Sequence, residues 1–127
     1  MKRISVIILF NLFALCFCIS CNEIYHHNTN IHISESALDY TMYVHYPPGE
    51  THAVENYMDC KIGRSSDMSF VNSRIDAQLT LNDHTTFYLK KYPGYLKIKL
   101  DKARNSEQAY DRIKNMCEGI KKVLAGK

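Results

Sequence analysis

Tryptophan is absent from this chain, and glycine and proline are scarce, with five and three residues among 127. So few glycines leave little of the flexible backbone that phosphate and cofactor sites use. The sequence contains no Gly-rich phosphate loop, nucleophile elbow, two-histidine zinc helix or calcium loop. It therefore predicts no cofactor, no metal site and no catalytic residues, and an enzyme is the least favoured class.

An excess of positive charge is also missing. The formal net charge is +3, and two of the cations, Lys2 and Arg3, lie at the extreme N-terminus. Residues 21–127 then hold 14 Lys and Arg against 13 Asp and Glu, which gives no electrostatic reason to expect a nucleic-acid partner. What is abundant is apolar and aromatic: 46% of residues are hydrophobic, with nine Tyr and five Phe. This composition predicts one folded domain.

The N-terminal segment reads as an export signal. Lys2 and Arg3 precede an apolar run over residues 4–19, and Ser20 follows it. The run is short for a helix that crosses roughly 30 Å of hydrocarbon, which takes about 20 residues. We therefore expect residues 1–20 to be a signal peptide.

The end of this segment is "CISC", residues 18–21, followed by polar "NE". It resembles the signal of bacterial lipoproteins, with Ser20 before the cysteine and Cys18 where that family usually has Leu. The resemblance implies cleavage before Cys21, lipidation of Cys21, and an envelope protein anchored to a membrane and facing the periplasm. Plain secretion and a retained helical anchor stay open as alternatives. Cys16 and Cys18 are expected to be small hydrophobes of the signal and not metal ligands.

Residues 21–36 are polar and rich in Asn and His, and predict a lipidated cysteine with a flexible tether, or at best an edge strand. His26, His27 and His32 lack the carboxylate or thiol partners of a metal site. Residues 37–127 are then a single domain.

Several segments of this domain alternate apolar and polar residues, as strands do: 39–46, 72–81, 85–92 and 95–102. "NDH" at 82–84 and "YPGY" at 92–95 are turn signals, so the last three strands form an antiparallel meander. Residues 51–62 are ambiguous. A helical stripe capped by Thr51 and a strand near Cys60 both fit, and the strand is weakly favoured.

The C-terminal segment changes its period. Its apolar residues recur at three- and four-residue steps, after a cap at Asn105 or Ser106, and predict a helix of roughly 18 residues. These are Ala109, Ile113, Met116, Cys117, Ile120, Val123 and Leu124. One apolar stripe must lie on an apolar surface. The predicted fold is α+β: an antiparallel meander sheet of about four strands with a C-terminal helix packed on one face.

Cys60 and Cys117 remain once the signal is removed. In an exported chain an even pair predicts a disulfide, and closing about 58 residues would stabilise the fold by roughly 4 kcal/mol. The alternative makes Cys60 a nucleophile with His52 or His84 as its base.

The predicted hairpin over residues 88–99 mixes tyrosines with lysines. Exposed Tyr offers contact area with few rotamers, so its candidate partner-binding residues are Tyr88, Lys90, Lys91, Tyr92, Tyr95, Lys97 and Lys99. Lysines that keep a sheet from aggregating are the alternative. We expect a protein that binds another protein, most plausibly an inhibitor or immunity factor against an exported toxin or hydrolase. A structural accessory of a secretion, pilus or conjugation apparatus and a small envelope enzyme are the alternatives.

Overall fold

The computed structural model describes residues 29–64 and 68–126. The predicted signal peptide (residues 1–20), Cys21, His26 and His27 lie outside the described residues. The strands are β1 (Asn30–Glu35), β2 (Asp39–His45), β3 (Ile75–Thr80), β4 (Thr86–Tyr92) and β5 (Tyr95–Asp101). The helices are α2 (Thr51–Met58) and α4 (Glu107–Leu124), with short helical turns at η1 (Pro48–Glu50), η2 (Asp59–Gly63) and η3 (Lys102–Arg104). None of the described helices has the length and apolarity needed to span a membrane.

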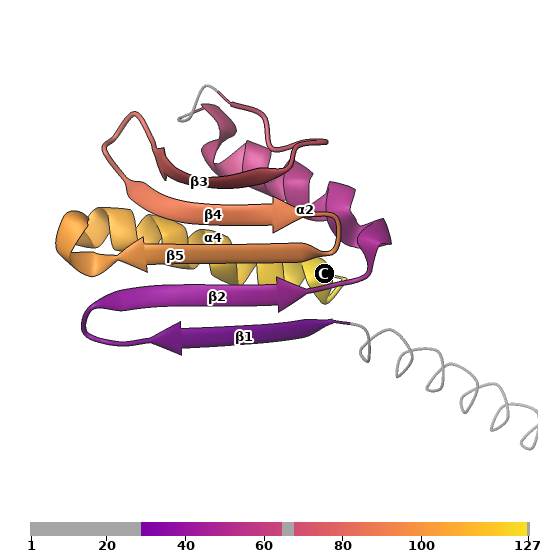
Figure 1. The fold of residues 1–127 in the computed structure, drawn as a ribbon, viewed down its shortest axis with the longest axis horizontal. Coiled ribbons are helices and arrows are strands. Elements are labelled where there is room, and N and C mark those ends of the chain that lie inside the picture. The colour runs from indigo at the N-terminus through magenta and orange to yellow at the C-terminus, as the bar shows by residue number, and fades with distance from the viewer. Residues whose placement is uncertain (1–28, 65–67, 127) are drawn as a thin grey trace, which may run out of the picture.

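All five strands form one antiparallel sheet in the order β1-β2-β5-β4-β3, with β5 at its centre (Figure 1). Alternating residues give each central strand one apolar face. In the register, Met42 and Leu89 lie on either side of Ile98, and all three are fully buried. The predicted α+β class is confirmed, with five strands where about four were expected.

The predicted meander is confirmed for β3, β4 and β5. Gly94 has φ +81° in the turn between β4 and β5, a backbone conformation that suits glycine after Pro93 in a type II turn. The Gly94 amide donates to Thr51 Oγ1 at 3.2 Å, and the Tyr46 amide donates to the Gly94 carbonyl at 3.0 Å. This turn is therefore fixed to the start of α2.

β1 corrects the predicted boundary of the domain. Residues 21–36 were expected to be mainly a tether, but Asn30–Glu35 pairs along the whole of β2 as an edge strand. Ile31 and Ile33 lie opposite Val44 and Met42 and are half-buried against the core. Two apolar residues among polar neighbours gave only a weak alternation. The described sheet nevertheless includes Asn30–Glu35, ahead of the boundary predicted at residue 37.

Residues 51–62 are helical, and the strand favoured near Cys60 was wrong. α2 continues into the π-helical turn η2, and Val54, Met58 and Ile62 are buried at four-residue spacing. Asp59, the first residue of η2, accepts a hydrogen bond from the amide of Phe70, which follows the helix, at 2.6 Å. The helix thus holds the segment that leads into β3.

α4 has the predicted length, 18 residues, and Ser106 is its cap, accepting from the Ala109 amide at 3.1 Å. Asn105 instead fastens the helix start to the sheet, since its side chain accepts from the Thr86 amide at 2.8 Å and donates to the Thr86 carbonyl at 2.9 Å. The stripe from Ala109 to Ile120 is buried. α2 and α4 cover the same face of the sheet (Figure 1).

The predicted disulfide is absent: Cys60 and Cys117 are both free thiols. Cys117 is buried on α4, where burial, with a smaller effect of the Glu118 carboxylate, raises its pKa to about 12. Cys60 is exposed, while Met58 and Ile62 on either side of it are buried. Because this segment is a helix, a residue two positions from each buried neighbour turns to solvent, and the two thiols do not face each other.

Candidate functional site

The face of the sheet turned away from α2 and α4 is covered by no described element (Figure 1). We call it the open face. Its central side chains are those of Tyr43, His45, Tyr88, Lys90, Tyr92, Tyr95, Lys97 and Lys99. Directly opposite residues of an antiparallel sheet point the same way, so the register sets these side chains in rows across the strands.

The middle row crosses all five strands. It consists of His32, Tyr43, Lys97, Lys90 and Asp76. The Lys97 ammonium lies 5.0 Å from the centroid of the Tyr43 ring and 5.7 Å from that of Tyr88. Lys90 stands directly opposite Lys97 and forms no ion pair with any carboxylate of the described residues. Two like charges therefore adjoin at the centre of the open face, which lowers stability, and Asp76 on the other side of Lys90 offsets part of this effect.

A second row lies toward the turn between β4 and β5. Its Tyr92 and Tyr95 rings stack with centroids 4.7 Å apart and an interplanar angle of 10°, and His45 lies 5.0 Å from Tyr95. The Arg74 guanidinium is 5.7 Å from the centroid of the Tyr92 ring. These ring contacts restrict the aromatic side chains before any partner arrives, which lowers the entropy lost on binding.

Six of the seven predicted partner-binding residues lie on the open face. They are Tyr88, Lys90, Tyr92, Tyr95, Lys97 and Lys99. Sequence reasoning missed Tyr43 and His45, which come from β2 and join the face only through its pairing with β5. Their alternation in residues 39–46 had placed them opposite the apolar residues, but gave no partner strand.

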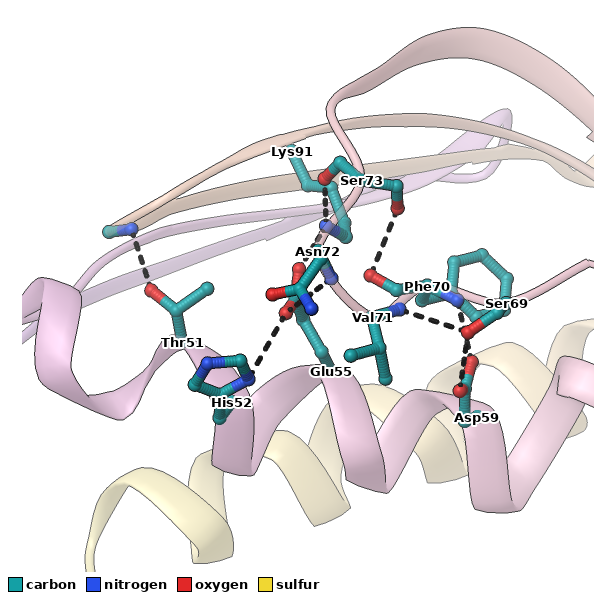
Figure 2. A network of polar contacts seen from close by, with 11 residues as sticks. Thr51, His52, Glu55, Asp59, Ser69, Phe70, Val71, Asn72, Ser73 and Lys91 are labelled. Atoms are coloured by element: carbon teal, nitrogen blue, oxygen red, sulfur yellow. Dashed lines mark hydrogen bonds and ion pairs between the residues drawn. The ribbon is translucent and has the colours of Figure 1, made fainter.

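The seventh residue, Lys91, is a correction. It points to the covered side of the sheet, its side chain is 4% exposed, and its ammonium donates to Glu55 Oε2 and to the Ser73 carbonyl (Figure 2). Glu55 Oε1 accepts from the Asn72 amide at 3.1 Å. Strand alternation explains this placement, since Phe87, Leu89 and Lys91 share one face of β4.

A hollow of about 420 Å³ lies beside the buried Lys91–Glu55 pair. It is lined by Pro48, Thr51, His52, Glu55, Asn72, Ser73, Arg74 and Pro93. His52 Nδ1 is 3.9 Å from Glu55 Oε1, and the His52 side chain is 69% exposed. Figure 2 shows α2 contributing Thr51, His52 and Glu55, with Asn72 and Ser73 on the segment before β3 facing them. The hollow thus lies between α2, that segment and the turn at Pro93.

No protein-family model, curated protein or solved structure matches this chain. The side chains of the open face and of the hollow are therefore the basis for inferring a function.

Two other kinds of site were considered from the sequence, a metal site and a Cys60 nucleophile with a histidine base. Within residues 29–64 and 68–126, no three His, Cys, Asp or Glu side chains gather as a metal site, and His32 lies across from Tyr43 on the open face. The described contacts of His52 and His84 do not include Cys60. Among the described residues, neither His52 nor His84 is therefore in the position of a base for the Cys60 thiol.

Proposed function

We propose that this protein is exported, anchored to an envelope membrane through Cys21, and binds another protein with its open face. The observation that carries the proposal is the position of Lys90 and Lys97. They lie directly opposite each other in the middle of a face that no described element covers.

Like charges directly opposite on neighbouring strands lower stability. Within the fold, Asp76 lies opposite Lys90 and offsets part of this repulsion, but no carboxylate of the described residues lies opposite Lys97. Departures from the rules of stable packing concentrate at functional sites. Carboxylates of a bound partner would pair with both ammonium groups and remove the repulsion that Asp76 leaves.

The proposed occupant is a protein with an acidic patch. Lys90, Lys97 and Lys99 lie in the middle of the open face, and the tyrosines around them are residues enriched in protein interfaces. A single-stranded nucleic acid fits less well. Tyr92 and Tyr95 stack on each other, so one face of each ring is already in contact, and His45 and Arg74 also lie beside these rings, which leaves less ring surface for bases.

The anchor rests on the resemblance of residues 18–21 to a lipoprotein signal. Residues 22–29 separate Cys21 from β1, and eight residues reach at most about 28 Å when extended. A lipid on Cys21 would therefore hold the domain near the membrane surface. Intact-mass analysis of protein from the envelope tests this: an N-terminus other than acylated Cys21 overturns the anchor.

The binding face is tested by site-specific photo-crosslinking in the envelope. A benzophenone side chain at Tyr92 is expected to crosslink a partner, whereas the same group at Lys122, exposed on α4, is not. Lys97→Glu should abolish the crosslink, and Lys122→Glu is the matched control that should retain it. Equal crosslinking from both positions, insensitivity to Lys97→Glu, or a crosslink only to a second copy of this chain would refute the proposed face.

The identity of the crosslinked partner then decides the class of binding protein. Within this proposal the chain is an inhibitor or immunity factor, which predicts a soluble exported toxin or hydrolase whose activity falls when the purified protein is added. Several subunits of one membrane complex would instead support the structural accessory of a secretion, pilus or conjugation apparatus. A crosslinked enzyme whose activity is unchanged contradicts inhibition.

A further inference from the structure

We propose that the hollow beside Lys91 and Glu55 receives an acidic side chain of the protein that docks on the open face. This inference rests on the proposed function and specifies how the partner is recognised. It makes Arg74 the residue that binds the carboxylate, with His52 beside it.

The hollow has the size of a ligand site. Its volume of about 420 Å³ lies within the range of roughly 300–1,000 Å³ that binding pockets occupy, and exceeds what one side chain needs. Pro48 and Pro93 provide apolar walls, while Thr51, Asn72 and Ser73 add polar groups. An aliphatic stem with a charged end suits such a lining.

The charges around the hollow select an anion. Glu55 is the only acid among the described residues that line it, and Lys91 is bound to Glu55, with both side chains 4% exposed. The other Glu55 oxygen accepts from the Asn72 amide, so the floor presents no net charge. Arg74 is exposed and forms no ion pair with a carboxylate of the described residues. A guanidinium in this position favours a carboxylate, which it can bind through two parallel hydrogen bonds.

The hollow is continuous with the open face. Arg74 lies against the Tyr92 ring, Tyr92 stacks on Tyr95 of the open face, and Pro93 between them lines the hollow. A protein seated on the open face therefore reaches the hollow by extending a side chain past Tyr92. This continuity favours a side chain of the same partner over a free small anion.

The first test uses a peptide probe on the full mature chain. Acetyl-Gly-Glu-Gly-amide is titrated against ¹⁵N-labelled protein, and acetyl-Gly-Gln-Gly-amide is the neutral control. We expect shifts at the amides of Thr51, Asn72 and Arg74 and at Arg74 Nε with the Glu peptide, and at least tenfold weaker binding of the Gln peptide. Equal binding of both peptides, or shifts confined to other parts of the domain, overturns the inference.

Variants separate the role of Arg74 from general charge. Arg74→Gln should weaken the Glu peptide about tenfold or more, and Arg74→Lys should retain part of the affinity, because it keeps the charge but loses the planar fork. Arg104→Gln removes an exposed arginine on η3 and should change nothing. Inorganic phosphate that binds as tightly as the Glu peptide at Arg74 would indicate an unselective anion site and overturn the choice of a side chain.

The same variants distinguish this inference from the proposed function. Lys97→Glu should abolish the crosslink at Tyr92 yet leave binding of the Glu peptide intact, since Lys97 lies outside the hollow. Arg74→Gln should weaken the crosslink without abolishing it. A crosslink that depends on Lys97 but not on Arg74 refutes the hollow alone. Peptide binding at Arg74 with a crosslink insensitive to Lys97 refutes the open face alone.

Discussion

Lys90 and Lys91 are neighbours in β4, yet they lie on opposite faces of the sheet. On the covered face, the Lys91 ammonium has two acceptors, the Glu55 carboxylate and the Ser73 carbonyl, and is almost inaccessible to water. On the open face, Lys90 lies between the like charge of Lys97 and the Asp76 carboxylate, and forms no ion pair with a carboxylate of the described residues. One lysine therefore completes the folded structure, whereas the other remains available to a partner.

The two faces also differ in what a substitution would change. Removing one member of a buried ion pair leaves a desolvated charge behind and is expensive. Removing a half-buried lysine from the open face leaves no desolvated charge behind, and should change stability by no more than about 1 kcal/mol. Substitutions on the covered face should thus change mainly the stability of the fold, and substitutions on the open face should change mainly the binding of a partner.

The largest expected effect is that of Lys91→Met. It leaves the Glu55 carboxylate buried without its cation, and should lower the free energy of unfolding by about 3–5 kcal/mol. Urea unfolding followed by circular dichroism measures the change. Lys97→Met, the matched variant on the open face, loses its contacts with the Tyr43 and Tyr88 rings and should cost at most about 1 kcal/mol.

Adding Glu55→Gln to Lys91→Met tests the physical cause. The amide of Gln is neutral and can still accept from the Asn72 amide, so the double variant should regain much of the lost stability. A double variant no more stable than Lys91→Met would show that lost packing, and not the unpaired charge, sets the cost.

The sequence predicted the class of the fold because its signals were local. Two-residue alternation identified β2, β4 and β5, and the change of period identified α4. The same alternation places Lys91 with Phe87 and Leu89, so its inward position was readable from β4 alone. Lys90 and Lys91 were nevertheless assigned to one surface because they are neighbours in sequence, and the inward position of Lys91 was therefore missed.

Other features depended on contacts that local patterns do not reveal. Glu55 and Lys91 are 36 residues apart in sequence, and the hollow beside them forms only when α2 packs near the turn at Pro93. Residues 51–62 carried few signals that separate helix from strand. Once the segment is helical, Cys60 faces solvent and the predicted disulfide fails with it.

Cys60 and Cys117 allow the same comparison of an exposed and a buried position within the helices. Iodoacetamide at pH 8 should modify Cys60 in the folded protein and leave Cys117 unmodified, because Cys117 is buried and its pKa is raised to about 12. Peptide mapping by mass spectrometry measures each site, and urea should make both reactive. If neither thiol of the native protein reacts until a reductant is added, the result would support the predicted disulfide between Cys60 and Cys117.

Glu35 offers a smaller test at the rim of the covered face. Hydrogen bonds from the Tyr110 hydroxyl and from the Lys102 ammonium lower its pKa below the ordinary 4.5, and it fastens β1 to α4. The unfolded chain therefore binds a proton at a higher pH than the folded one, and stability falls as acid passes through the folded pKa.

The matched variant is Glu35→Gln, which removes this titration. The difference in unfolding free energy between wild type and variant should be greatest near neutral pH, and should vanish in acid below the folded pKa. Thermal unfolding from pH 7 to pH 3 measures it. A difference that stays constant over this range would mean that the carboxylate charge does not hold β1.

The smallest effect is the most direct comparison of the two faces, a double-mutant cycle on Lys90 and Lys97. Lys90→Met, Lys97→Met and the double variant isolate the pairwise energy, which should be repulsive by a few tenths of a kcal/mol. Because Lys90 and Lys97 are only half-buried, on a face that no described element covers, about 1 M salt, where the screening length is about 3 Å, should remove most of the repulsion. The corresponding cycle on Lys91 and Glu55 should be attractive and much less sensitive to salt, since that pair is buried. A favourable coupling between Lys90 and Lys97 would remove the main reason for placing a partner on the open face.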